Sequence, residues 1–120
     1  MKFKEDIPFH IYLQDKVREK GMKDPDIYNS VNMDRKLWNN IINGRKKGII
    51  RKETAVSIAL GLKLNLKETK ELVERSGNSF GYSLFDKIIK AAIESEEYNI
   101  NEINEVLLNY GQVTLGSKSN

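Results

Sequence analysis

The sequence predicts an all-α protein, and three observations carry this prediction. Apolar residues recur every three or four positions along most of the chain, which is the spacing of an amphipathic helix. Asp, Asn or Ser residues precede these segments and glycines follow several of them, as helix caps do. Sustained alternation of apolar and polar residues, which indicates a strand, is missing except at residues 112–115.

The first predicted helix covers residues 9–20. Pro8 suits the first turn of a helix, and Gly21 follows at the point where the helix should end. A second, shorter helix is expected over residues 24–30, with Asp24 as its cap and Pro25 at its first helical position.

A third helix is expected over residues 35–43, between the cap Asp34 and the stop signal Gly44. We interpret Trp38 as a core residue of this helix, because it lies three residues before Ile41 on the apolar side. The remaining positions of the helix are charged or amide side chains, and these are expected to face outward: Arg35, Lys36, Asn39, Asn40 and Asn43.

Four further helices follow from the same signals. Asn65 is expected to cap the fifth helix and Gly77 to end it, and Asn101 is expected to cap the last. The four predicted ranges are residues 52–62, 66–76, 83–97 and about 101–109. The last two helices carry more apolar residues than one face requires, so most should pack on the first five helices and the rest could form a homodimer or partner interface.

Composition excludes several classes of function. The chain has 120 residues, enough for one domain spanning 1–120, and it contains no cysteine and one histidine, His10. Disulfides, thiolate metal sites and cysteine nucleophiles are therefore excluded, and neither a metal nor a cofactor is expected. No apolar run is long enough for a membrane span, and the charged N-terminus does not suit a secretory signal, so a cytoplasmic location is expected.

We expect no enzymatic activity. His10 has no nucleophile motif around it and is interpreted as a surface or helix-start residue. The acidic side chains of residues 94–97 lack a histidine or a further ligand nearby and are interpreted as a solvated helix end. The glycines at positions 44 and 48 lack the spacing of a phosphate-binding loop.

Charge is distributed unevenly along the chain. Residues 35–52 contain seven Lys or Arg and no acid, whereas residues 84–120 contain three Lys against six Asp or Glu. A cationic stretch of this density attracts polyanions.

Arg35 can bond a guanine edge through two parallel contacts, and Asn39 can do the same for adenine. The candidate base contacts are Arg35, Lys36, Asn39 and Asn40, and the candidate phosphate contacts are Asn43, Arg45, Lys46, Lys47, Arg51 and Lys52. We expect the basic run to form one continuous surface that includes Arg35, Lys36, Arg45, Lys46, Lys47 and Lys52.

Residues 13–73 resemble the lambda-repressor-like (Cro/cI/Xre) helix-turn-helix family. The segments that carry the resemblance are Val17-Arg-Glu-Lys-Gly-Met, Asp26-Ile-Tyr, Val31-Asn-Met-Asp-Arg-Lys-Leu-Trp-Asn-Asn-Ile-Ile-Asn-Gly and Ala55-Val-Ser-Ile-Ala-Leu-Gly-Leu-Lys-Leu-Asn. The resemblance implies a five-helix DNA-binding core over residues 8–76, with two additional C-terminal helices over residues 82–112. It further implies sequence-specific binding of double-stranded DNA by a small transcriptional regulator, whose third helix enters the major groove.

The whole chain also resembles uncharacterised bacterial helix-turn-helix modules found alone or fused to other domains. The matching segments are Asp34-Arg-Lys-Leu, Leu66-Lys-Glu-Thr, Phe85-Asp-Lys-Ile-Ile and Ile100-Asn-Glu-Ile-Asn-Glu-Val-Leu. This second resemblance names no activity.

Two positions depart from the lambda-repressor-like pattern. Where that family usually places a glutamine that clamps a phosphate and braces the recognition helix, this chain has Asp24, an anion that would repel DNA. Where the family usually has a small residue, this chain has Tyr28, which predicts a wider helix crossing or a different packing. Both departures favour an alternative function, a protein-interaction adaptor or RNA binder on the same scaffold, whereas the acid-free run of residues 35–52 favours DNA.

Overall fold

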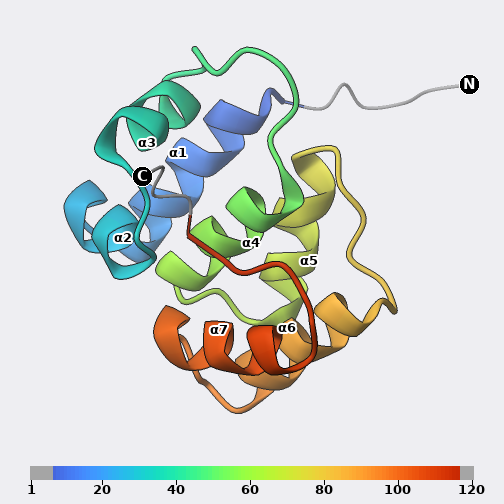
Figure 1. Ribbon diagram of the computed structural model, residues 1–120. Coiled ribbons are helices and arrows are strands. Elements are labelled where there is room, and N and C mark those ends of the chain that lie inside the picture. The colour runs from blue at the N-terminus through green and yellow to red at the C-terminus, as the bar shows by residue number, and fades with distance from the viewer. Residues whose placement is uncertain (1–6, 117–120) are drawn as a thin grey trace, which may run out of the picture.

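The computed structural model describes residues 7–116, and this part of the chain is helical without strands (Figure 1). The helices α1 to α5 form one group with α4 at its centre, and α6 and α7 lie together on the opposite side of α4 and α5 from α3. The bounds are α1 Phe9–Lys20, α2 Asp24–Ser30, α3 Arg35–Ile42, α4 Lys52–Gly61, α5 Leu66–Arg75, α6 Leu84–Glu94 and α7 Ile100–Asn109. The all-α prediction is confirmed.

Several predicted helix boundaries are wrong. The helices α3, α4 and α5 each end one residue earlier than expected, at Ile42, Gly61 and Arg75. Asp24 is the first residue of α2 rather than its cap, and Lys23 takes the cap position without a side-chain bond. The helix α6 ends at Glu94, three residues early, and Glu96 adopts a left-handed conformation with φ of 55°. Asn99 rather than Asn101 caps α7, because its side chain accepts bonds from the N–H groups of residues 101 and 102. Residues 112–115 form no strand.

The core surrounds α4. Every residue from Thr54 to Gly61 is buried, so this helix is covered by neighbours on all sides instead of presenting one apolar stripe. Trp38 of α3 is wholly buried, which confirms its interpretation as a core residue. The prediction that the C-terminal helices pack onto the rest is also confirmed, since Ile89, Ile103 and Leu107 are at most 2% exposed.

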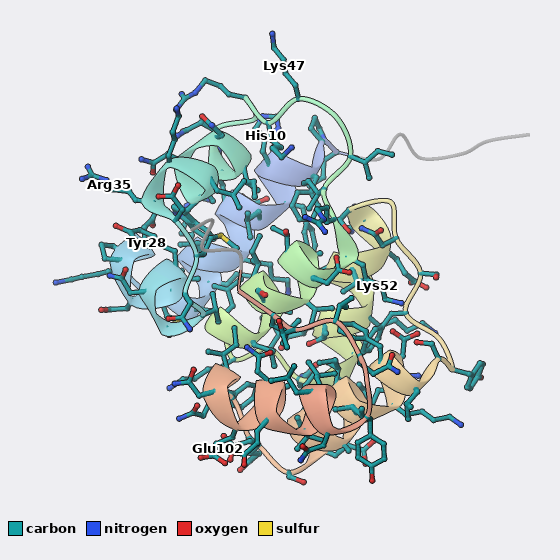
Figure 2. The ribbon with its side chains drawn as sticks, in the orientation of Figure 1. His10, Tyr28, Arg35, Lys47, Lys52 and Glu102 are labelled. Atoms are coloured by element: carbon teal, nitrogen blue, oxygen red, sulfur yellow. The ribbon has the colours of Figure 1, made fainter. Side chains whose placement is uncertain are left out.

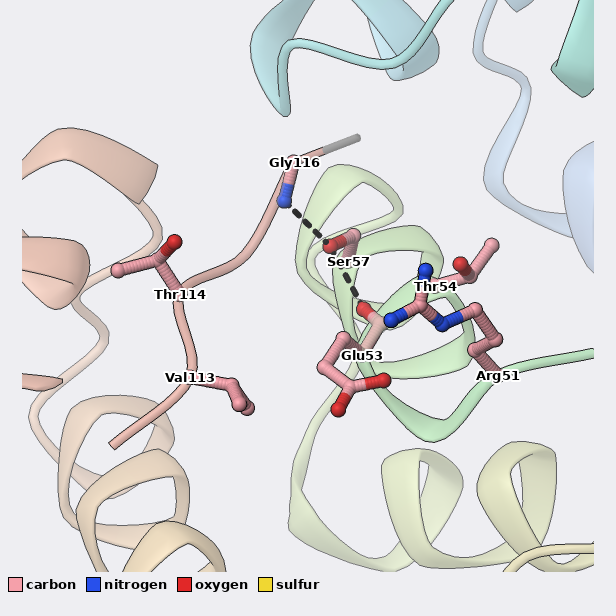
Figure 3. A pocket seen from close by; sticks show the side chains of 7 residues that line it. All are labelled: Arg51, Glu53, Thr54, Ser57, Val113, Thr114 and Gly116. Atoms are coloured by element: carbon pink, nitrogen blue, oxygen red, sulfur yellow. Dashed lines mark hydrogen bonds between the residues drawn. The ribbon is translucent and has the colours of Figure 1, made fainter. Parts of the chain in front are cut away.

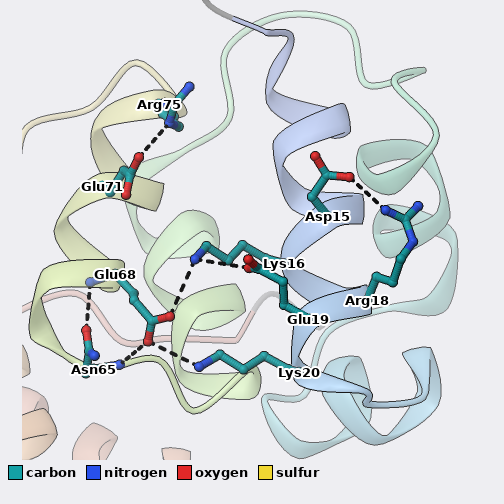
Figure 4. Close-up of polar contacts among 9 residues, drawn as sticks. All are labelled: Asp15, Lys16, Arg18, Glu19, Lys20, Asn65, Glu68, Glu71 and Arg75. Carbon is teal, nitrogen blue, oxygen red and sulfur yellow. Dashed lines mark hydrogen bonds and ion pairs between the residues drawn. The ribbon is translucent and has the colours of Figure 1, made fainter.

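Glu68 of α5 connects α5 to α1 (Figure 4). Its carboxylate lies 3.4 Å from Lys16 Nζ and 3.2 Å from Lys20 Nζ. Glu68 also forms a capping box with Asn65, in which each side chain accepts a bond from the other residue's N–H. Burial alone raises the pKa of Glu68, but the Asn65 N–H and the two ammonium groups outweigh burial and lower it.

The segment after α7 crosses α4 toward the turn between α2 and α3 (Figure 1). The Asn104 side chain holds Leu115 by two bonds, one to its N–H and one to its carbonyl oxygen. The Gly116 N–H donates to Ser57 Oγ at 3.3 Å, and that hydroxyl donates to the Glu53 carbonyl (Figure 3). Gly116 has φ of +85°, and a Cβ there would lie 3.0 Å from the carbonyl oxygen of Val31, so only glycine fits closely.

Candidate nucleic-acid interface

The helix α3 divides into a buried face and an exposed face. Trp38, Ile41 and Ile42 are at most 8% exposed and fix the helix on the core. Asp34 caps the helix, because its side chain accepts a bond from the Lys36 N–H at 3.3 Å. Since the buried residues occupy one side, the polar residues of α3 must occupy the side that faces solvent.

Five of the predicted contact residues gather around one shallow hollow on this exposed side. The hollow has a volume of about 460 Å³ and joins the start of α3 to the loop that follows it. Asp34 is its one acidic member, a residue that sequence reasoning treated only as a cap. The lining residues are Asp34, Arg35, Lys36, Asn39, Asn40 and Arg45.

Backbone hydrogen bonds hold the basic loop, residues 44–48, against the end of α3. The N–H groups of Arg45 and Lys46 both donate to the Asn40 carbonyl oxygen, at 2.7 and 3.0 Å. Gly44 makes this turn with φ of +72°, and a Cβ at that position would lie 2.8 Å from atoms of the His10 ring. His10 therefore supports the turn from α1, a role that no local sequence pattern indicates.

Three further predicted phosphate contacts lie beyond the hollow and are exposed: Asn43, Lys46 and Lys47. Asn43 Nδ2 donates to the Asn39 carbonyl at 2.9 Å, and Lys46 Nζ donates to the Lys47 carbonyl at 3.0 Å. Lys47 projects from the tip of the loop, and Arg35 projects from the same end of the molecule (Figure 2). No ion pair of the described residues involves Arg35, Lys36, Arg45 or Lys47.

The last two predicted phosphate contacts lie elsewhere, so the expected single continuous surface is wrong. Arg51 lines a separate cleft of about 160 Å³ between α4 and the C-terminal segment (Figure 3). Lys52 Nζ lies 2.7 Å from Asp86 Oδ1, on the far side of α4 from Arg35 (Figure 2). Asp86 is 2% exposed, and its other oxygen accepts the Gly81 N–H at 2.9 Å. Lys52 thus connects α4 to α6, a structural role.

Asp24 braces α3 from α2. Its Oδ2 accepts a bond from Trp38 Nε1 at 2.8 Å, so the indole N–H inside the core has a partner. The Tyr28 ring packs beside the same indole, with ring centroids 6.3 Å apart and planes inclined by 38°. Both departures from the lambda-repressor-like pattern therefore act on Trp38. Gln14 adds a contact that sequence reasoning missed, since its Nε2 donates to the Ile42 carbonyl at 2.7 Å.

Within residues 7–116, no group of three or more Asp, Glu or His side chains is arranged to hold a metal ion. Nor is any helix among residues 7–116 sufficiently long and apolar to cross a membrane. Comparison of the chain with protein-family models, with curated proteins and with solved structures gives no significant match.

Proposed function

We propose that this protein binds double-stranded DNA in a sequence-specific manner, as a small regulator of the lambda-repressor-like helix-turn-helix type, with α2 and α3 as the helix pair. One observation carries the proposal: Arg35, Lys36, Asn39, Asn40 and Arg45 line a single exposed hollow on α3. The major groove of B-DNA admits an α-helix, and these are the side-chain types that bond purine edges and phosphates.

The roles divide by position along α3. Arg35 and Lys36 lie in the first turn, from which helix-turn-helix proteins reach base edges, and Asn39 and Asn40 lie one turn later. Arg45, Lys46 and Lys47 follow the helix and suit the phosphates that flank the groove. Lys52 is left out because it is paired with Asp86, and Arg51 because it lines another cleft.

The salt dependence of affinity distinguishes phosphate contacts from base contacts. If the three phosphate contacts Arg45, Lys46 and Lys47 displace counterions, log affinity falls with log salt at a slope of about −2.7. Replacing Lys46 and Lys47 by alanine should reduce that slope by about 2 and weaken all sequences alike. Replacing Arg35 by alanine should instead cost about 1–3 kcal/mol on a preferred site and relax the choice of one base pair.

The measurement is a titration of labelled duplexes at several salt concentrations, with sites supplied by selection from random sequences. A matched control replaces Lys67 and Lys70 by alanine, which removes two exposed charges from α5 and leaves α3 and its loop intact. Absence of duplex affinity at low salt, or an equal effect of the control, would overturn the proposal. Equal or tighter binding of duplex RNA would do so as well, because its narrow major groove excludes a helix.

A further inference from the structure

An apolar groove runs between α6 and α7, at the end of the molecule opposite α3. Its volume is about 570 Å³, and Ile88, Ala91 and Ile103 are among the residues that line it. Three large side chains at its walls are strongly exposed for apolar residues: Leu84 at 44%, Val106 at 42% and Tyr110 at 60%. Apolar surface concentrated in one groove marks an interaction site.

The charges of the groove are separated to its two ends. Lys87 lies in the first turn of α6, where α6 begins beside the end of α7. Glu97 and Glu102 lie at the opposite end, after α6 and in the first turn of α7. The groove therefore has one cationic end, an apolar middle and one anionic end.

We propose that this groove binds a second copy of the chain about a two-fold axis, so that the two α6–α7 pairs form a four-helix bundle. A two-fold axis through the middle of the groove brings the Lys87 end of one copy against the Glu97 and Glu102 end of the other. Each copy also supplies the apolar ridge, Val106 and Tyr110, that fills the other's groove.

The charges at the two ends of the groove favour a second copy of the chain over a uniformly basic partner helix. A uniformly basic helix would pair with Glu97 and Glu102 but would face Lys87 with a like charge at the other end. A second copy satisfies both ends, because its own groove presents the same charges in reverse order. Dimerisation through this groove does not require DNA binding, so either proposal can fail without the other.

The first test measures the molar mass of the full chain by light scattering and sedimentation over a wide range of protein concentration. We expect a reversible shift from 13.8 kDa toward twice that mass. Val106→Glu should raise the dissociation constant on the order of a hundredfold, because each dimer would bury two new carboxylates. Leu108→Glu is the matched control: Leu108 lies on the same helix and is 66% exposed, but it does not line the groove.

The second test reverses the charges. Lys87→Glu gives a chain whose groove is acidic at both ends, and Glu97→Lys with Glu102→Lys gives one that is basic at both ends. Neither variant should self-associate, and an equimolar mixture should form heterodimers. A chain that stays monomeric at every concentration, a Leu108→Glu effect as large as that of Val106→Glu, or charge-reversed variants that dimerise unchanged would each overturn the proposal.

Discussion

The bond between Asp24 and Trp38 predicts a specific difference between two substitutions at position 24. Asp24→Ala removes the acceptor and leaves the indole N–H of a wholly buried ring without a partner. An unsatisfied buried donor costs about 1–3 kcal/mol, and loss of a carboxylate from the first turn of α2 adds about 0.3–1 kcal/mol. Because Asp24 is only half-buried, water can partly replace it, and we expect a total of about 2 kcal/mol.

Asp24→Asn keeps an oxygen at the same place, so this variant should lose only the helix-dipole part, about 0.3–1 kcal/mol. Trp38 is the sole tryptophan, and its fluorescence reports unfolding in urea directly. With a slope of about 2 kcal/mol per molar, Asp24→Ala should lower the midpoint by about 1 M. Asp26→Asn is the control, because Asp26 is an exposed carboxylate of the same turn.

An Asp24→Ala variant as stable as the unaltered chain, or equal losses of stability for Asn and Ala at position 24, would refute the stabilising role of the bond between Asp24 and Trp38. The same Asn variant also bears on the proposed function. It removes an anion near the proposed DNA surface while keeping the brace on α3, so duplex affinity should rise severalfold at low salt. Unchanged affinity would mean that the α2 end of the surface lies away from the phosphates.

Trp38→Ala should cost about 3–5 kcal/mol in thermal unfolding followed by circular dichroism, and an equally stable variant would contradict the burial of the ring. Burial alone raises the pKa of Asp86, but its ion pair and hydrogen bonds lower it below the ordinary value, so its contribution to stability is present above about pH 4 and is lost as pH falls through the folded pKa. Asp86→Asn should therefore destabilise the protein at neutral pH and flatten the acid side of its stability curve, and an unchanged acid slope would exclude the assignment. Gly44→Ala should cost about 1–3 kcal/mol more than Gly48→Ala in urea unfolding, because both have positive φ but only the Cβ at position 44 would meet the His10 ring. A biotinylated duplex carrying the protein should capture a second, labelled duplex, and Val106→Glu should abolish this capture without weakening binding to a single duplex.

Periodicity and caps predict the helices of this chain well, and the errors have local causes. Asn99 and Asn101 are both good caps, and the choice depends on Ile100, which is 3% exposed and joins the helix as its first residue. The early end of α6 depends on a left-handed Glu96, and glutamate carries no signal for that conformation. The complete burial of α4 depends on neighbours from both sides, which a single segment does not reveal.

The candidate site also has parts that local sequence predicts and parts that depend on distant residues. The acid-free run predicted the exposed side of α3 and its loop, because charge and helical phase are both local properties of the sequence. The pairing of Lys52 with Asp86, 34 residues away, has no local signal in the sequence. Because of this ion pair, Lys52 is not part of the cationic surface that the composition of residues 35–52 predicted. The bond from Trp38 to Asp24 likewise joins positions 14 apart on different helices.

The positions of the proposed DNA surface on α3 and of the groove between α6 and α7 limit how a dimer could bind DNA. Glu102 lies on the side of α7 turned away from α3, so the groove and the proposed DNA surface occupy opposite ends of the molecule (Figure 2). Helix-turn-helix dimers that read a palindrome place both recognition helices on one side, about 34 Å apart, in successive turns of one duplex. A dimer joined through α6 and α7 would instead turn its two α3 surfaces away from each other. Such a dimer fits two duplex segments better than two halves of one site, and dimerisation would then bring DNA segments together rather than double the length of sequence recognised.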